Sequence, residues 1–356
     1  MELEIFSKTK IYIMAPYQDK GGGRSLHQLA KVLVDMGYRA FVYYYDRMNV
    51  DKPCCERDSI QICHNIEDDY GNILIVPESH AEYLINYERI RKVIWWLSLH
   101  YYRSHNDVWK TKAILERHGI DKRLYPVLLP FVFAKNYKSY LQKEYRYIDS
   151  TLGDYYHFYN CFYVKEYLES KGISEGAMMY LCGPVTEEFC NYNKESIMSK
   201  KENIVAINPS KIEKDVLYRF KKCISKLDTP IRLVEIKNMT PNEVKNVLEA
   251  TKVYVDLGYF PGPERMPREA VLMYCNVFTS VIGAAGNEYD VSIDYKYKSD
   301  IKLGHMMSIA KKIEDMILNY ETQVQDFELY RENVKKQIVC FDRNIMQVLK
   351  NIPKEP

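Results

Sequence analysis

The sequence has no long apolar run and no excess of charge of either sign. No segment approaches the roughly 20 consecutive apolar residues that a membrane-spanning helix needs. The 50 Lys and Arg nearly balance the 48 Asp and Glu, and the net charge of +2 gives no reason to expect a nucleic-acid partner. The first residues, MELEIFSKTKIYIM, lack the charged stretch and apolar core of a signal peptide. We therefore expect a cytoplasmic protein.

The sequence also has few of the features that mark disulfide or metal proteins. Its nine cysteines are odd in number and scattered, which fits reduced thiols. The nearest approach to a metal set is Cys54, Cys55, Cys63 and His64, but adjacent cysteines bind one ion awkwardly and the spacing matches no common zinc finger. We expect no metal. Tryptophan is rare, at 3, whereas tyrosine is common, at 32, which fits either nucleotide bias in the genome or stacking on sugars.

The first half of the chain alternates between apolar strands and amphipathic helices. Lys10–Ala15 predicts a strand, Gln18–Arg24 a glycine-rich turn, Ser25–Met36 a helix with Ser25 as N-cap, and Ala40–Tyr45 the next strand. This order indicates a parallel, doubly wound sheet. We expect further strands at Ile73–Val76, Val93–Leu99, Val127–Phe133, Tyr155–Tyr159 and Met178–Leu181, and helices at Ala81–Ile90, Trp109–His118 and Val164–Lys171.

A second run of the same kind follows a polar, lysine-rich stretch, Thr186–Glu202. It predicts strands at Ile204–Ile207, Ile231–Ile236 and Val253–Leu257, and helices at Asp215–Ser225, Pro241–Ala250 and Phe327–Val348. With 356 residues the chain is long enough for two domains. We predict an α/β protein with two Rossmann-like domains facing a cleft, at 1–185 and 203–325, a linker at 186–202, and a C-terminal helix over 326–356 that returns to the N-terminal domain.

The stretch Val253–Ser280 is the most informative part of the sequence. It predicts a strand, a loop broken by glycine and proline, a helix with Pro267 in its first turn, and another strand. The helix N-terminus would point out of the sheet edge, which suits a phosphate and a hydroxylated sugar. Four charged side chains accompany it: Glu264, Arg265, Arg268 and Glu269.

Three further sites lie where predicted strands end. Gly21, Gly22, Gly23 and Arg24 follow the first strand; this loop holds a phosphate or a sugar hydroxyl, or is only a tight turn, and it lacks the GxGxxG of a dinucleotide site. Lys211, in Asn208–Lys211 (NPSK), neutralises a diphosphate or is simply solvated. His100, after WWLSL, contacts a sugar hydroxyl or a leaving phosphate, or is structural.

Several segments resemble the GT-B glycosyltransferases of the large family 4 type. PREAVLMYCNVFTS resembles that family's donor-site helix, P-x-x-E-A-M-A-x-G-x-P-V-V, with Glu269, Ala270 and Val277 on matching positions. GGGRSLHQLAKVLVDMGYRAFVY resembles its opening glycine loop and helix, and NPSK and MTPNEVKNVLEATKVYVD resemble elements of its second domain. PGPERMPREA and GAAGNEYDVSIDYKYK are most similar to a bacterial polysaccharide subgroup.

The resemblance implies roles for the candidate residues. Glu269 would contact the ribose of a nucleotide, and Glu264 is the carboxylate nearest to the family's second glutamate, whose place Pro261 holds. His100 would act on the acceptor side, and with Glu264 it forms the expected catalytic pair. The rest of the donor site would comprise Pro209, Lys211, Arg265, Arg268, Gly283 and Asn287, and the acceptor or phosphate loop Gly21, Gly22, Gly23 and Arg24.

The activity that the resemblance implies is sugar transfer from a nucleotide-sugar donor to a glycan or lipid-linked acceptor. It would retain anomeric configuration, need neither metal nor cofactor, and serve bacterial polysaccharide, O-antigen or capsule biosynthesis. The basic segment Arg103–Arg123 faces anionic lipid at the inner membrane surface, or is a solvated helix face. Two other functions fit the same sequence: a nucleotide-sugar 2-epimerase on the same fold, and a non-catalytic sugar- or nucleotide-binding module.

Overall fold

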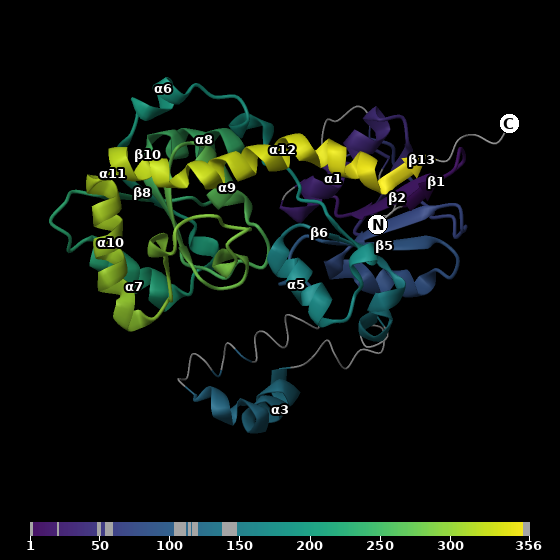
Figure 1. Cartoon of the computed structure of the whole chain (residues 1–356), viewed down its shortest axis with the longest axis horizontal. Helices are drawn as coiled ribbons and strands as arrows, with labels where there is room; N and C mark the ends of the chain where they lie inside the picture. The colour runs from purple at the N-terminus through teal and green to yellow at the C-terminus, as the bar shows by residue number, and fades with distance from the viewer. Residues whose placement is uncertain are drawn as a thin grey trace. The chain divides into compact units, whose positions relative to one another are not determined.

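The computed structural model describes residues 3–19, 21–47, 51–53, 60–102, 112, 115, 120–136 and 148–351. The chain divides into two units (Figure 1). Unit 1 comprises Met1–Asn160, Val164–Gly183 and Asp342–Pro356. Unit 2 comprises Cys161–Tyr163 and Pro184–Phe341.

Unit 1 is built on a parallel sheet, which has six strands in the described residues, in the order β3-β2-β4-β5-β6-β7. The strands are β2 (Lys10–Ala15), β3 (Arg39–Tyr44), β4 (Ile73–Pro77), β5 (Arg91–Trp96), β6 (Tyr156–Tyr159) and β7 (Met178–Tyr180). The strand order reverses between β2 and β4. In doubly wound sheets this reversal opens a crevice at the carboxyl ends of the two strands.

Helix α1 shows why the helices of unit 1 form where they do. Its residues Leu26, Leu29 and Leu33 recur at helical spacing and are all buried, because that face covers the sheet. In the described residues, the helices of unit 1 are α1 (Gly22–Asp35), α3 (Tyr125–Asn136) and α5 (Phe162–Ser170), whose first two residues are assigned to unit 2. The 3-10 helices there are η1 (Glu78–Asn86), η2 (Lys122–Leu124), η3 (Leu152–Asp154) and η4 (Glu175–Ala177).

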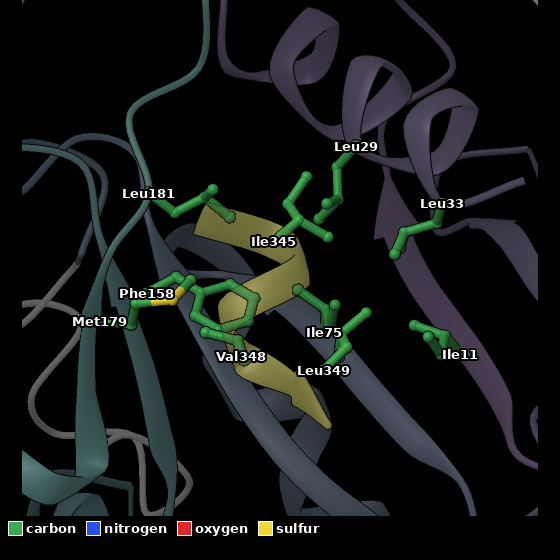
Figure 2. Close-up of a pocket in the computed structure, with 10 residues that line it drawn as sticks. All are labelled: Ile11, Leu29, Leu33, Ile75, Phe158, Met179, Leu181, Ile345, Val348 and Leu349. Carbon is green, nitrogen blue, oxygen red and sulfur yellow. The ribbon is translucent and has the colours of Figure 1, made fainter. Parts of the chain in front are cut away.

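The C-terminal end of the chain completes the core of unit 1. Helix α12 (Glu328–Val348) belongs to unit 2 as far as Phe341 and to unit 1 beyond it. The next strand, β13 (Leu349–Asn351), pairs in parallel with β1 (Leu3–Ile5). Figure 2 shows Ile345, Val348 and Leu349 lining an apolar cavity together with side chains of the sheet and of α1. The last turn of α12 is thus part of the apolar interior of unit 1.

Unit 2 contains a second parallel sheet, which in the described residues has the order β12-β11-β10-β8-β9. Its strands are β8 (Glu202–Ile207), β9 (Arg232–Glu235), β10 (Thr251–Asp256), β11 (Asn276–Ser280) and β12 (Lys298–Ser299). Every residue of β11 is buried, as expected of a parallel strand covered on both faces. Here the order reverses between β8 and β10.

Helix α8 shows the local signals that start a helix in unit 2. Thr240 accepts the backbone N–H of Glu243, whose side chain accepts that of Thr240, and Pro241 opens the helix. The α-helices of unit 2 besides α12 are α6 (Lys194–Met198), α7 (Lys214–Ile224), α8 (Pro241–Ala250), α9 (Arg265–Leu272), α10 (Met306–Leu318) and α11 (Tyr320–Gln323). Its 3-10 helices are η5 (Glu187–Phe189), η6 (Pro209–Lys211), η7 (Ala284–Gly286), η8 (Tyr295–Tyr297), η9 (Leu303–His305) and η10 (Val324–Phe327).

The two parallel sheets predicted from the sequence are present, but several elements differ. The strand expected at Val127–Phe133 is wrong, since these residues lie in α3; a short continuous apolar run fits a strand and a buried helix segment alike. Ala81–Ile90 is not an α-helix, because η1 covers Glu78–Asn86 and ends before Tyr87. Thr186–Glu202 is not only a linker, since it contains η5 and α6. Apart from Lys112 and Leu115, the helix expected at Trp109–His118 lies outside the described residues.

The N-terminus of α1 also differs from the expectation. Ser25 lies inside the helix and is buried, while Gly21 is the N-cap with φ of +54°. A left-handed φ favours glycine over Ser, so the chain turns into the helix at the glycine run and not at the serine.

Lys201, the residue before β8, connects the C-terminal ends of two helices in unit 2. Its Nζ donates to the backbone carbonyls of Leu248 (3.0 Å), Thr251 (2.6 Å) and Met273 (2.6 Å). Thr251 and Met273 are the C-caps of α8 and α9. An ammonium ion is favourable there because it satisfies carbonyls that have no partner within the helix.

We predict that Lys201→Met lowers the free energy of unfolding by about 2 kcal/mol, because hydrogen bonds from a charged donor are lost at once. Urea denaturation followed by circular dichroism measures this change. Lys200→Met is the matched control: its exposed ammonium contacts Glu249, and we expect a change below about 1 kcal/mol. An equal decrease in the free energy of unfolding in the two variants would contradict the stabilising role of the Lys201 hydrogen bonds.

Candidate functional site

Three loops of unit 2 leave neighbouring strands at the same edge of the sheet. Strand β8 ends at Ile207, β10 at Asp256 and β11 at Ser280, and the three strands are adjacent and parallel. Their carboxyl ends therefore lie side by side, at the reversal of strand order between β8 and β10. This is the position at which sheets of this kind bind ligands.

The loop after β8 is a short, rigid turn. The Asn208 side chain accepts the backbone N–H of Ser210 at 3.1 Å, and Pro209 opens the 3-10 turn η6. Lys211 is the last residue of that turn. Proline and the Asn208 cap leave this loop little freedom, so the backbone that carries Lys211 is well defined.

The loop after β10 packs against this turn so closely that one position admits only glycine. A Cβ on Gly258 would lie 2.9 Å from Cβ of Lys211 and 3.0 Å from its carbonyl oxygen. The hydroxyl of Ser280, at the end of β11, donates to the Gly258 carbonyl at 2.5 Å. Gly258 thus joins the ends of all three strands.

Lys211 and Glu264 form an ion pair across this edge, between Nζ and Oε2. Glu264 is the N-cap of α9 and has φ of +39°, a left-handed conformation that costs energy for any residue with a side chain. Such strain is found where a loop positions a functional side chain. The structure therefore brings together two residues that the sequence indicated separately.

A buried carboxyl, Asp256, lies at the end of β10 near this ion pair. Its oxygens accept the backbone N–H of Gly258 at 3.1 Å and the hydroxyl of Tyr254 at 3.2 Å. Burial and the neighbouring Glu264 raise the pKa of Asp256 to about 7, although Lys211 acts in the opposite direction. The carboxyls of Asp256, Glu264 and Glu269 all add to burial in raising the pKa of the Tyr254 hydroxyl. A positive charge is therefore favoured among these groups.

The charged residues of α9 have different surroundings. Arg268 is 4% exposed, and its guanidinium donates to the Glu264 carbonyl at 3.1 Å and to the Gln337 side chain at 3.2 Å. Glu269 is 5% exposed and accepts the hydroxyl of Thr186 at 3.0 Å. Arg265 is half-buried at the first position of the helix. Glu269 lies in the second turn of α9, because the helix begins at Arg265.

Gly283 and Asn287 shape the loop after β11. Gly283 has φ of +72°, and a Cβ there would lie 2.2 Å from the Phe260 carbonyl oxygen, to which Ala284 N–H donates at 2.8 Å. Gly283 thus lets this loop touch the loop after β10. The Asn287 side chain accepts the backbone N–H of Tyr289 and of Asp290 at 2.9 and 3.2 Å. Both positions set the course of the backbone.

The glycine loop of unit 1 lies at the carboxyl end of β2, beside the reversal of strand order in that sheet. Gly22 and Gly23 are confined: a Cβ would lie 3.2 Å from the Leu97 side chain in the first case and 2.5 Å from the Gln18 carbonyl in the second. Gly21 is in open space. Arg24 donates to the carbonyl of Asp19 at 3.2 Å and lies 3.6 Å from its carboxylate, so its guanidinium is held against its own loop.

His100 lies in a turn after β5, which ends at Trp96 and not at the histidine. Its ring is half-buried and meets Tyr101 edge-on, with ring centroids 5.4 Å apart. The buried Glu78 follows β4 in the same unit and accepts the backbone N–H of Leu97 at 2.8 Å. Burial raises the pKa of the Glu78 carboxyl to about 8. Glu78 therefore anchors the first residue of the segment that leads to His100.

Asp256 and Glu78 are not among the residues predicted from the sequence. Both carry a signal that was available: a carboxylate that directly follows a buried apolar strand, in VYVD and in ILIVPE. Among the described residues, no group of three or more His, Cys, Asp or Glu side chains could hold a metal ion. Cys54 and Cys55, of the four residues considered as zinc ligands, lie outside the described residues.

No protein-family model matches the sequence, and no curated protein matches it. Solved structures do match. A glycosyltransferase from Rickettsia africae has a TM-score of 0.61 at 12% identity, with 96% of this chain and 98% of that chain covered. Sucrose-phosphate synthase from Thermosynechococcus elongatus has a TM-score of 0.64 at 11% identity, with 96% and 98% covered. HepE of Anabaena in complex with UDP has a TM-score of 0.56 at 11% identity, with 95% and 98% covered.

These likenesses show the fold. The protein has the GT-B fold, in which two α/β units are each built on a parallel sheet. The fold expected from the sequence is therefore confirmed, while the roles of the individual site residues stay predictions.

The buried carboxyl of Asp256 predicts a pH-dependent stability. Its pKa of about 7 in the fold exceeds the ordinary value of 3.8, so between about pH 4 and 7 the folded chain keeps a proton that the unfolded chain has lost. The free energy of unfolding should fall with rising pH across this window, relative to Asp256→Asn, by up to about 1.4 kcal/mol per pH unit. Above pH 7 the difference should level off. Urea denaturation of both proteins at a series of pH values measures it; a difference independent of pH would contradict the assignment.

Proposed function

We propose that this protein is a glycosyltransferase that moves a sugar from a nucleotide-diphosphate donor to a hydroxyl of a glycan or lipid-linked acceptor. The observation that carries the proposal is the pair Lys211–Glu264, held over buried Asp256 at the β8/β10 reversal and beside the N-terminus of α9. A cation and a helix N-terminus at this edge suit a diphosphate. The fold shared with HepE, whose structures hold UDP and UDP-glucose, supports a nucleotide-sugar donor.

The proposed reaction exchanges one C–O bond for another. The bond between the anomeric carbon and the diphosphate breaks, the acceptor hydroxyl oxygen bonds to that carbon on the same face, and the hydroxyl proton passes to the departing phosphate oxygen. Negative charge grows on the diphosphate, where the Lys211 ammonium stabilises it. Because the diphosphate competes with Glu264 for Lys211, Glu264 is released to accept a hydroxyl of the donor sugar.

The remaining donor-side residues have supporting roles in this proposal. Glu269, oriented by Thr186, accepts the ribose hydroxyls, and Arg265 adds positive charge at the helix start. Arg268 positions α9 through its bonds to the Glu264 carbonyl and Gln337. Pro209, Gly283 and Asn287 hold the two flanking loops in place.

The acceptor side is proposed to lie in unit 1. His100 contacts the acceptor hydroxyl, and the loop formed by Gly21, Gly22, Gly23 and Arg24 offers backbone N–H groups to a phosphate or hydroxyl of the acceptor. The confinement of Gly22 and Gly23 supports a loop of fixed shape. Glu78 keeps the segment after β5 in place through the Leu97 N–H.

The wider context is part of the same proposal. Independence of metal is proposed because Lys211 and the N-terminus of α9 can stabilise the leaving group, and retention of configuration is proposed from the resemblance to family 4 glycosyltransferases. The resemblance of PGPERMPREA to a bacterial polysaccharide subgroup supports a role in surface polysaccharide, O-antigen or capsule assembly, with the protein in the cytoplasm at the inner face of the membrane.

We predict that Lys211→Met lowers turnover of the preferred donor about a hundredfold, because one preorganised charge on the leaving group is removed. The donor is first found by thermal shift with UDP-, GDP-, dTDP- and CMP-sugars, and turnover is then measured by nucleotide release. Lys214→Met, which removes an exposed lysine at the start of α7, is the control and should keep full turnover.

Three outcomes would contradict the proposal. If no nucleotide sugar in the panel binds, the donor assignment fails. If the donor alone is converted into its 2-epimer, the protein is an epimerase on the same fold. If a nucleotide sugar binds but is neither transferred nor hydrolysed, with Lys211→Met changing affinity alone, the protein is a binding module.

A further inference from the structure

Three large apolar side chains are exposed on one face of the α3 region in unit 1. Leu124, Val127 and Phe131 are 51%, 63% and 73% exposed. Their spacing of three and four residues places them on the same side of the helix. Among the described side chains from Arg123 to Val132, none is buried. The helix therefore presents an apolar face outward.

The composition of α3 differs from that of an ordinary surface helix. Asp121 starts the preceding turn by accepting the backbone N–H of Arg123 at 2.9 Å. The ten residues that follow Leu124, YPVLLPFVFA, contain no charged side chain. A surface helix of a globular protein normally has a charged face opposite its apolar one. An exposed helix without such a face indicates a partner that is itself apolar.

Positive charge surrounds this apolar stretch in the sequence. Lys122 and Arg123 precede it and Lys135 follows it, so basic residues flank it on both sides in the sequence. Residues 103–147 contain ten Lys and Arg against four Asp and Glu, a net charge of +6, whereas the whole chain carries +2. Much of this segment lies outside the described residues, and the charge count rests on the sequence alone.

The length of α3 determines whether it could cross a bilayer or only lie at its surface. Its 12 residues are fewer than the roughly 20 that cross a bilayer. No described helix is long and apolar enough to span a membrane. A short apolar helix flanked by basic residues fits the boundary between headgroups and acyl chains, where its apolar side chains are buried and the basic ends reach anionic headgroups.

We propose that α3 docks this protein on the surface of an anionic phospholipid bilayer, with Leu124, Val127 and Phe131 entering the boundary between headgroups and acyl chains. A second copy of the chain is a poorer occupant, because two segments of net charge +6 repel each other. Anionic lipid supplies both the apolar phase and the opposite charge. The inference rests on the membrane location in the proposed function and deepens it, but it does not depend on the donor chemistry.

Flotation of the full chain with phospholipid vesicles tests the proposal. We expect it to bind vesicles of phosphatidylcholine and phosphatidylglycerol, to bind phosphatidylcholine vesicles weakly, and to be released as salt rises. Val127→Ser combined with Phe131→Ser should lower the vesicle-bound to free ratio at least about tenfold. The matched control is Leu318→Ser with Leu329→Ser, two leucines of unit 2 that are 66% and 63% exposed, which should bind vesicles like the unaltered chain.

The result that would overturn the proposal is equal vesicle binding by the α3 variant and the unaltered chain, or no binding to anionic vesicles at all. Sedimentation showing a dimer that only the α3 variant loses would also overturn it, in favour of self-association. Nucleotide-sugar binding is measured on the same proteins. It should be unchanged in the α3 variant, so failure of the donor assignment and failure of membrane docking give different results.

Discussion

Close backbone packing at the end of the second sheet is the constraint on which the candidate site depends. Gly258 lies so near Lys211 that a methyl group on its Cα would not fit. Gly283 likewise lies close to the backbone of Phe260, and a methyl group would not fit there either. Hydrogen bonds from Ser280 and Ala284 join the loop after β10 to the end of β11 and to the loop that follows it. A site built from loops is thereby held nearly as rigidly as one built on strands, which is what stabilising a developing charge requires.

The electrostatics of the site follow from that packing. Closely packed loops exclude water from Asp256, and the low polarity around it keeps its proton bound to higher pH. A neutral Asp256 leaves Lys211 to be balanced by Glu264 alone. An anionic ligand that reaches Lys211 therefore meets one competing carboxylate and not two. The strained backbone of Glu264 also stores energy that a ligand-induced rearrangement of this N-cap would release.

The sequence predicted most of the fold because strands covered on both faces are continuous apolar runs. Helix α8 was predicted with its observed bounds, since Thr240, Pro241 and Glu243 signal its start locally. The apolar run of α3 is short and rich in Val and Phe, which fits strand and helix alike. Lys211 and Glu264 were each indicated, but their pairing depends on the order of β8 and β10, and sequence spacing does not encode that order.

The shared helix α12 has a consequence for the order in which the chain is made. The interior of unit 1 includes Ile345, Val348 and Leu349, and a separate two-stranded sheet pairs β1 with β13. A ribosome releases the N-terminal sheet long before these residues emerge, whereas nearly all of unit 2 is contiguous. The unit that is translated first is therefore completed last. During synthesis, the apolar side chains around Leu29 and Phe158 stay uncovered until the last turn of α12 has been made.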